Sequence, residues 1–365
     1  MTDKMKVYSK VKQALKKMLP TANQNQVVVL AMMVTGIVMG GKAQLSEMSL
    51  HVPEKALPDS LAKRFQRFVK NDHVVSTTLF LPFAQQIIAA LAGSRLVVMM
   101  DASQVARGCM TLMVAVVYRN RALPLAWIVY KGKKGHTTAD RHIAVLQLLQ
   151  EIVPPDAEVV LLGDAEYDTV EMLEWVTAHT NWFFVVRTSP RILLTEQGRT
   201  YPFSDLLHGQ HGCVVVTDVL FTKQTFGPVM AIATWQPDYE RPLYLVTNHD
   251  RLQNACTFYQ LRFKVETLFS DTKSRGFNIQ KSHLSDPKRI ARLLLAAVLA
   301  YIWMVFLGVE TADDESRRRQ VDRSNRTDKS LFRLGFDWLK HSLTRGLDFN
   351  VLFSPPSHIT SLCVR

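Results

Sequence analysis

The sequence predicts an α/β fold built on a mixed β-sheet with helices on both faces, flanked by helical N-terminal and C-terminal regions. Three observations lead to this fold class. Short apolar, β-branched segments begin near residue 95 and alternate with helical periodicity as far as residue 187. The helical signal is absent between residues 189 and 254, where strand-like segments lie among Gly, Pro, Gln and Thr. Helical periodicity dominates residues 1–90 and returns after residue 255.

Residues 1–90 contain three predicted helices. A basic amphipathic segment, Lys4–Met18, is followed by an apolar segment, Gln26–Met39, which ends at two glycines. The third segment is Ser60–Val75. Three of its cations fall on one side of the helix, away from its large apolar residues: Lys63, Arg67 and Lys70. Residues 1–90 are therefore predicted to form a helical DNA-end-binding domain, and a solvated charged face is an equal alternative for this helix.

Strands and helices follow one another from residue 95 in a recognisable order. Three strands separated by turns suggest an antiparallel meander, and a helix, a strand, a helix and a strand come next. The predicted strands are Arg95–Asp101, Met110–Tyr118, Leu123–Tyr130, Glu158–Gly163 and Trp182–Arg187, and the helices between them are Ala139–Ile152 and Thr169–His179. This order is the one expected of a ribonuclease-H-like core.

The remaining segments complete the predicted domain organisation. Two further helices, Ala255–Ser274 and Lys288–Val309, are assigned to the core, which therefore comprises residues 91–188 and 255–309. Residues 189–254 form a β-rich insertion, and residues 310–365 form a basic linker followed by a C-terminal helix.

One apolar segment raises the question of a membrane. Leu293–Val309 is 17 residues long and uncharged, which is the short edge of a spanning helix. A helix that is hydrophobic all round can instead lie inside a large soluble domain. The other long apolar segment, Val27–Met39, is shorter still, so we expect a buried helix and no membrane partner.

The charge of the chain is concentrated at its ends. The formal charge is +12. Residues 1–90 hold 12 basic and 5 acidic side chains, and residues 261–365 hold 18 and 11, whereas residues 91–260 hold 14 and 16. DNA held at two basic regions, with acidic residues acting between them, fits this distribution. The basic loop at residues 131–142 is either a phosphate track or a solvated turn.

Cysteine usage and the N-terminus bear on the cellular compartment. The four cysteines are far apart and form no Cys-x-x-Cys pair, which favours neither a zinc site nor a disulfide framework and indicates a reducing compartment. The first residues are too charged for a signal peptide. We therefore expect a cytoplasmic protein.

Two aspartates end predicted strands. Asp101 follows LVVMM and Asp164 follows VVLLG, and carboxyl ends of buried strands commonly carry reactive groups. Neighbouring strands lie about 4.8 Å apart, which would let both carboxylates reach one metal ion. Two oxygen-ligated Mg²⁺ ions about 3.5–4 Å apart can activate a water or a 3′-hydroxyl and stabilise a leaving oxygen. Either aspartate alone is commonly structural, and Glu166 and Asp168 compete with Asp164.

A third carboxylate lies within a stripe of reactive side chains on the predicted helix Ala255–Ser274. At about 100° per residue, Arg262, Glu266 and Lys273 all lie within about 60° of Tyr259. An amphipathic helix with an ordinary Arg–Glu pair is the alternative. The complete stripe favours an active site.

These residues carry a resemblance to a known family. Their spacing, Tyr-x2-Arg-x3-Glu-x6-Lys, resembles the signature of the bacterial insertion-sequence DDE transposases of the IS-four type. The resemblance spans most of the chain: LVVMMDAS and VVLLGDAEYD are similar to the strands with the first two acidic residues, and PLYLVTN to the strand before the signature helix. The family inserts a β-domain between the second and third carboxylates. Many members have Arg-Gly-Phe where this chain has Ala165, Glu166 and Tyr167.

The resemblance implies specific roles for individual residues. Three carboxylates are implied to be catalytic and to bind Mg²⁺, for which Mn²⁺ can substitute: Asp101, Asp164 and Glu266. Three residues are implied to contact phosphates of the transposon end: Tyr259, Arg262 and Lys273. An aromatic residue of the insertion is implied to stack on a flipped base, for which there are two candidates: Tyr244 and Trp235.

The expected function is DNA transposition. The enzyme would cut a phosphodiester bond at each transposon end by a two-metal mechanism, and the freed 3′-hydroxyl would attack target DNA. The expected partners are double-stranded transposon ends and target DNA, with a homodimer in the DNA-bound complex, in the bacterial cytoplasm at the nucleoid. A hairpin intermediate is implied by the resemblance alone. The alternative is a catalytically inactive relic that retains DNA-end binding.

Overall fold

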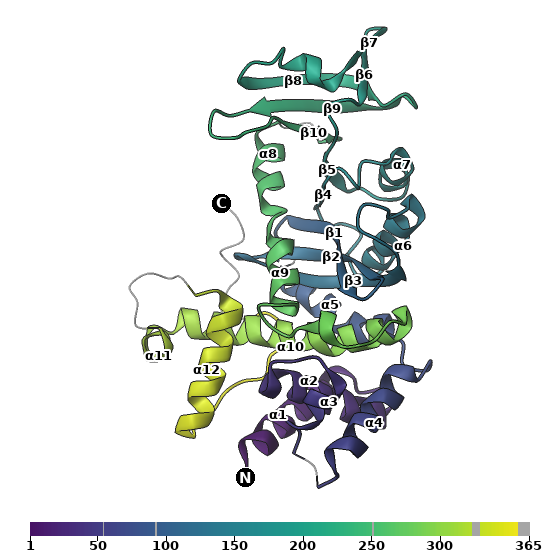
Figure 1. Ribbon diagram of the computed structural model, residues 1–365. Coiled ribbons are helices and arrows are strands. Elements are labelled where there is room, and N and C mark those ends of the chain that lie inside the picture. Colours follow the sequence, from purple (N-terminus) through teal and green to yellow (C-terminus); the bar gives the residue numbers. More distant parts are fainter. Residues whose placement is uncertain (54, 92, 250–251, 323–328, 357–365) are drawn as a thin grey trace.

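The computed structural model of the chain describes residues 1–53, 55–91, 93–249, 252–322 and 329–356. A single ten-stranded sheet runs along the molecule, with N-terminal helices at one end and small strands at the other (Figure 1). A long helix, α10 (Pro287–Asp313), crosses between the sheet and the N-terminal helices.

The N-terminal region is helical, as the sequence predicts. Its helices are α1 (Asp3–Met18), α2 (Gln24–Gly40), α3 (Leu45–Ser49), α4 (Pro58–Lys70) and α5 (Ser76–Leu91). The side chains of Thr2 and Asn23 accept hydrogen bonds from the first free amides of α1 and α2, which is the usual way that polar residues begin a helix. The sequence analysis did not predict α3 and α5. An internal proline, Pro82, weakens the local helix signal of α5.

The core sheet has the predicted strands. They are β1 (Leu96–Ala106), β2 (Cys109–Tyr118), β3 (Arg121–Lys131), β4 (Val159–Gly163) and β5 (Phe183–Arg187). They lie in the order β3-β2-β1-β4-β5; β1, β2 and β3 are antiparallel neighbours, and β4 is parallel to both β1 and β5. Four of the five are short or buried runs of Val, Leu, Met and Phe, typical of a sheet covered on both faces. This arrangement confirms the ribonuclease-H-like fold class.

The β-rich segment extends the same sheet. Its strands are β6 (Leu193–Glu196), β7 (Arg199–Pro202), β8 (Gly212–Phe221), β9 (Phe226–Trp235) and β10 (Leu243–Thr247). The last strand, β10, pairs antiparallel with β5 of the core and with β9. The insertion is therefore hydrogen-bonded into the core sheet through β10.

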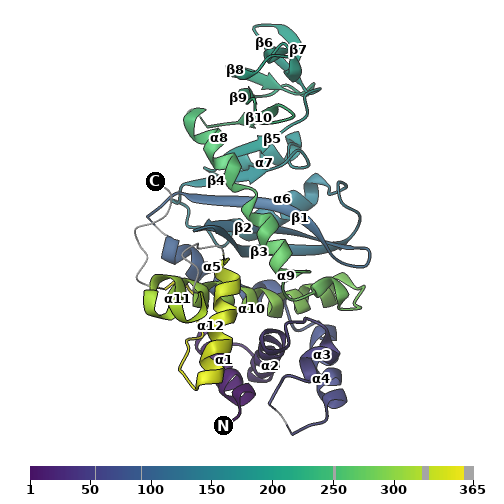
Figure 2. The same cartoon turned by 60° about the vertical axis from the view of Figure 1, so that its left-hand side comes forward.

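Helices cover both faces of the core sheet (Figures 1 and 2). On one side lie α6 (Ala139–Gln150) and α7 (Val170–His179), and on the other lie α8 (Leu252–Leu261) and α9 (Lys264–Thr272). The C-terminal helices are α11 (Glu315–Val321) and α12 (Leu331–Arg345). The predicted linker at residues 310–329 is thus partly helical, because α10 continues to Asp313 and α11 follows; residues 323–328 lie outside the described residues.

Helix α10 is a core helix of the protein. By length and composition it could cross a membrane, but 94% of its most apolar 18-residue window is buried inside the protein. It contacts α2, α4, β3 and α12. Its buried Arg292 donates to the carbonyl oxygens of Val69 and Val74 at 2.9 and 2.8 Å and to Asp72 at 2.6 Å, which ties the N-terminal helices to the core.

Two glycines bring α10 and α12 into backbone contact. A Cβ on Gly308 would lie 1.8 Å from the carbonyl oxygen of Leu331, and one on Gly335 would lie 1.9 Å from that of Met304. Any larger residue would force the helices apart. The start of α12 is therefore held in one position against α10.

The prediction of one continuous helix, Ala255–Ser274, is wrong, because the structure divides this segment into two helices, α8 and α9. At the break, the amide of Arg262 donates a hydrogen bond to the carbonyl oxygen of Tyr259, and the amide of Glu266 donates one to that of Phe263. Each bond reaches three residues back, whereas an α-helix bond reaches four. This tighter winding changes the rotation assumed for a continuous helix. Lys273 lies just beyond the end of α9.

Candidate active site

Two parallel strands bring Asp101 and Asp164 to one edge of the sheet. Met99 of β1 lies opposite Leu162 of β4 in the register. Each aspartate is two residues further along its strand direction, so the two are at the same level. Asp164 follows the end of β4, as the sequence predicts. Asp101 instead lies within β1, which continues to Ala106.

The surroundings of Asp101 disfavour its negative charge. Its side chain is 13% exposed. The pKa of Asp101 is raised to about 6, chiefly by burial and also by the negative charge of Asp164, although the hydrogen bond from the amide of Ala102 to Oδ1, at 2.8 Å, opposes the rise. Two carboxylates that repel each other in this way are relieved by a bound cation.

Glu266 lies apart from the aspartates, in the first turn of α9. Its side chain is 56% exposed, and its Oε1 is 3.4 Å from Nη2 of Arg262. The other guanidinium nitrogen, Nη1, is 3.9 Å from Oδ2 of Asp101. Arg262 therefore lies between Asp101 and Glu266.

The donor set fits a divalent cation in part. Carboxylate oxygens are the ligands that Mg²⁺ prefers, and the negative charges of Asp101 and Asp164 oppose each other at this edge of the sheet. In the described part of the chain, however, no three His, Cys, Asp or Glu side chains are gathered closely enough to hold a metal ion. Asp101 and Asp164 lie together at one edge of the sheet, and Glu266 is not gathered with them.

Arg262 and Tyr259 form the buried part of the signature. They are 7% and 3% exposed. The guanidinium lies 5.8 Å from the centre of the Tyr259 ring and 4.7 Å from that of Phe263. Burial opposes the charge of Arg262, but Tyr259 and the nearby carboxylates raise its pKa. The arginine therefore stays charged within a group of acidic side chains.

Lys273 reaches the same edge of the sheet from the end of α9. Its Nζ donates a hydrogen bond to Oγ of Ser103 in β1. The pKa of Lys273 is lowered to about 8, chiefly by burial and also by the positive charge of Lys134, although Asp101 opposes the shift. The structure thus brings Arg262 and Lys273 to Asp101, although they are not on one helix.

The sequence analysis did not single out Lys134 as a site residue. Its positive charge lowers the pKa of both Asp101 and Lys273. Its loop is anchored at Thr137, whose amide donates to Oε1 of Glu166 at 3.0 Å and whose hydroxyl is hydrogen-bonded to that of Tyr130 at 2.6 Å. The basic composition of this loop was visible in the sequence, but the contact with Glu166 joins residues 29 apart.

A second feature missed in the sequence lies beneath Asp164. His142 of α6 is fully buried, with its ring 4.9 Å from that of Tyr167. Burial lowers the pKa of His142 to about 4, although the charge of Asp164 opposes this. Neither ring nitrogen has a hydrogen-bond partner among the described residues. The second aspartate is therefore backed by a neutral, aromatic layer.

The remaining predicted DNA contacts lie away from the carboxylates. On α4, the apolar side chains of Leu61, Phe65 and Phe68 are buried. Three cations of the same helix are exposed: Lys63, Arg67 and Lys70. The structure therefore presents the basic face of α4 to solvent.

The two aromatic candidates of the insertion differ in exposure. Tyr244 is 6% exposed, and its ring packs edge-on against Phe203 at 5.3 Å. Trp235, at the end of β9, is half-buried; its Nε1 donates to the carbonyl oxygen of Tyr239 at 2.8 Å, and its ring lies 4.4 Å from His211. Of the two rings, that of Trp235 is the accessible one.

Comparison with known proteins places this geometry in context. Residues 94–303, more than half of the chain, match the family model described as the transposase DDE domain. A cryo-EM structure of a piggyBac transposase synaptic complex with hairpin DNA is 10% identical, with a TM-score of 0.48 and coverage of 94% of this chain and 78% of that one. A crystal structure of Ciona intestinalis endonuclease V with inosine-containing DNA is 13% identical, with a TM-score of 0.26 and coverage of 62% and 98%. No curated protein matches the chain.

Proposed function

The chain belongs to the family of transposase DDE domains, and from this premise we propose that it is a metal-dependent DNA transposase that cuts phosphodiester bonds at transposon ends and joins the freed 3′-hydroxyl to target DNA. The observation that carries the proposal is the pairing of Asp101 and Asp164 at one edge of the sheet, with Arg262 linking them to Glu266. Asp101 and Asp164 are the carboxylates predicted at strand ends, and Glu266 is the one within the signature spacing.

The carboxylates would hold divalent cations. Asp101 and Asp164 provide hard oxygen ligands, which suit Mg²⁺ and also Mn²⁺, and Glu266 would complete the set. Two bound ions activate a water or a 3′-hydroxyl and stabilise the leaving 3′-oxygen. The burial of Asp101 and Arg262 keeps bulk water away from these charges and strengthens their interactions.

Arg262 and Lys273 would bind phosphates on either side of the reacting one. An arginine can bind a phosphate through two parallel N–H donors, and a lysine acts as a point charge. The charge of Lys134 reaches the same place, since it acts on both Asp101 and Lys273. The cations around the carboxylates would thus hold the cut end of the DNA in line for attack.

We expect Arg262→Ala and Lys273→Ala to slow strand joining more than the first nick, by about 10-fold or more. The cut end has to be retained after cleavage, and each substitution removes a charge-assisted contact of about 1.5–3 kcal/mol. The measurement follows nicking, end release and joining separately, on intact and on pre-nicked DNA. Lys133→Ala is the matched control, because this exposed lysine lies in the same basic loop as Lys134. Equal slowing of all three steps would contradict the role of a clamp.

The exposed basic face of α4 would bind the transposon end at a distance from the cut. Replacing Lys63, Arg67 and Lys70 together by Ala in the full chain should lower the slope of log K against log salt by about 2.7, because each phosphate contact contributes about 0.9. Fluorescence anisotropy with end DNA over a range of salt measures this slope. Replacing Lys12, Lys16 and Lys17 on α1 removes the same charge and serves as the control. An unchanged slope in the α4 variant would show that the basic face of α4 does not contact DNA phosphates and is only a solvated surface.

A direct assay tests the proposed function. The purified chain is incubated with Mg²⁺ or Mn²⁺ and DNA that contains the flanks of its own element, and the cut ends are mapped. Cuts at the element ends support a transposase. The alternative is a relic that binds ends without cutting, and one observation supports it: Glu266 lies away from the aspartates. A relic would bind end DNA and would not cleave it with either metal.

Further parts of the proposal rest on the family resemblance. Joining two ends requires two active sites, so the DNA-bound form would be a homodimer. The resemblance to the IS-four type further suggests a hairpin intermediate, a bacterial source and a cytoplasmic location at the nucleoid. Trp235 would be the residue that stacks on a flipped base, because its ring is accessible whereas that of Tyr244 is buried.

A further inference from the structure

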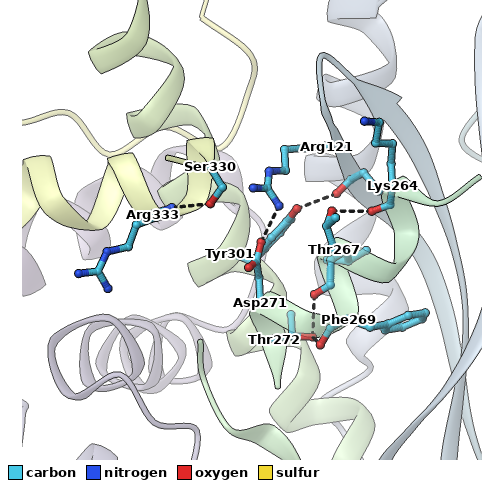
Figure 3. A network of polar contacts seen from close by, with 11 residues as sticks. Arg121, Lys264, Thr267, Phe269, Asp271, Thr272, Tyr301, Ser330 and Arg333 are labelled. Carbon is cyan, nitrogen blue, oxygen red and sulfur yellow. Dashed lines mark hydrogen bonds and ion pairs between the residues drawn. The ribbon is translucent and has the colours of Figure 1, made fainter. Parts of the chain in front are cut away.

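A cleft of about 420 Å³ lies on the flank of α9. Figure 3 shows this region from close by. Four segments that are far apart in the sequence line it: the end of α2 at Gly41, the start of β3, α9 with the turn that follows it, and the start of α12. Its polar lining includes Arg121, Thr267, Asp271, Arg275, Ser330 and Arg333. The sequence analysis did not assign a role to any of these six residues.

The floor of the cleft is an internal ion pair. Nη1 of Arg121 lies 2.9 Å from Oδ2 of Asp271, with the two side chains 9% and 10% exposed (Figure 3). Beneath them, the hydroxyl of Tyr301 donates to the carbonyl oxygen of Ala122 at 3.1 Å. Because Arg121 and Asp271 neutralise each other, the floor carries no surplus charge.

The rim of the cleft carries a surplus of positive charge. Arg275 is exposed, and no described residue forms an ion pair or hydrogen bond with its guanidinium. Arg333 is 69% exposed, and Asp337, 3.0 Å from its Nε, also pairs with Lys329 at 2.9 Å. Asp337 thus forms ion pairs with two cations, so these three side chains together carry one positive charge. The N-terminus of α12, which opens at Ser330, adds the partial positive charge of its free amides.

Both rim arginines stand on fixed backbone. The amide of Arg275 donates to the carbonyl oxygen of Ser270 at 3.1 Å, and a Cβ on the next residue, Gly276, would lie 1.7 Å from the carbonyl oxygen of Asp271. This turn therefore closes tightly on α9. Arg333 lies in the first turn of α12, which the Gly308–Gly335 contact holds against α10. A ligand would find the two cations already placed, which lowers the entropic cost of binding.

The cleft begins beside the catalytic stripe. Thr267, in its wall, directly follows Glu266 in α9. From Glu266 to Asp271 the helix advances about 7.5 Å, which matches the rise of about two nucleotides in one strand of B-DNA. If the DNA strand follows α9 from Glu266 toward the end of the helix, it reaches the level of Asp271 within about two nucleotides.

We propose that this cleft binds a backbone phosphate of the transposon-end DNA, a few nucleotides from the cut, through Arg275 and Arg333. The inference rests on the proposed function, because it takes the DNA as already placed at the carboxylates. It adds a phosphate site that lies outside the signature residues and uses the start of α12, a helix otherwise packed against α10.

The experiment compares two full-length double variants with the wild type. Arg275→Ala with Arg333→Ala removes the rim. Arg319→Ala with Arg345→Ala removes the same charge from exposed positions outside the cleft, and Arg319 is likewise paired with a neighbouring carboxylate, Glu315, at 2.5 Å. Binding of a duplex with the terminal sequence of the element is measured over a range of salt. The rim variant should lose about 1.8 from the slope of log K against log salt, and the control should keep the wild-type slope.

A scan with single methylphosphonates locates the contact, since each one removes the charge of one phosphate. The wild type should lose affinity at several positions near the cut, where Arg262 and Lys273 also bind, and the rim variant should become insensitive at one of these positions. Equal slopes in the rim variant and the control, or the same scan for wild type and rim variant, would overturn the cleft proposal. A wild type that binds with the rim-dependent slope but cuts no DNA would overturn the transposase activity and leave the cleft standing.

Discussion

Replacing Asp101, Asp164 or Glu266 by the corresponding amide is expected to lower DNA strand cleavage by about 10³-fold or more. An amide keeps the size of the side chain but removes the charge that holds a divalent cation, and catalysis of phosphodiester cleavage depends on correctly held cations. Binding of end DNA should remain within about twofold of the wild type, because phosphate contacts elsewhere supply most of the affinity. Cleavage of labelled end DNA and anisotropy at the same salt measure the two effects.

Asp168→Asn is the matched control for these variants. Asp168 is a half-buried carboxylate four residues after Asp164, and it accepts a hydrogen bond from the hydroxyl of Thr188 at 2.6 Å. Its amide should cleave DNA at close to the wild-type rate. A variant at any of the three predicted positions that still nicks at that rate would remove the residue from the site. Glu266 is the most informative of them, since it lies apart from the two aspartates.

Replacing Arg121 by Ala is expected to lower the free energy of unfolding by about 3–5 kcal/mol. The substitution leaves Asp271 buried without its partner, and an uncompensated buried charge is costly. The pair joins β3 to α9, so its loss also loosens the helix that carries Glu266. Thermal and urea unfolding measure the change. Arg319→Ala, which breaks an exposed pair with Glu315, should cost at most about 1 kcal/mol.

The pH dependence of this loss distinguishes a buried charge from lost packing. Burial raises the pKa of Asp271 to about 6, although Arg121 and Arg275 lower it. Because this pKa lies above the unfolded value, the folded protein takes up the proton more readily, and stability falls as the pH rises from about 4 to above 6. Without Arg121 the pKa rises further. Arg121→Ala should therefore be less destabilising at pH 5 than at pH 8, and an equal loss at both would indicate packing alone.

Local patterns were sufficient for the core strands, and they placed two of the three candidate carboxylates. Val, Leu and Met in short segments specify buried strands, Asp101 lies within one of these strands, and Asp164 directly follows another. The parallel pairing of β1 and β4 then follows from the order of the elements. The family match confirms a transposase domain, whereas the roles of the individual site residues remain predictions.

Contacts between distant residues could not be predicted in the same way. No Pro or Gly in the sequence marks the break between α8 and α9. Lys273, just after α9, contacts Ser103 of β1. The position of Lys134 depends on Thr137 meeting Glu166, and the burial of Tyr244 depends on Phe203. Each of these is a packing choice between segments, and periodicity along one segment does not encode it.

The central position of α10 sets the timing of folding during synthesis. Helix α2 is apolar, and one of its faces packs against α10, a helix that begins nearly 250 residues later in the chain. At about 5–20 residues per second, a ribosome needs roughly 12–50 s to make the intervening chain. For that time the face of α2 that packs on α10 has no partner, whereas α1, α3 and α4 are already made and cover its other faces. Contacts of such sequence separation also form slowly. The N-terminal helices are therefore made first and complete their packing last.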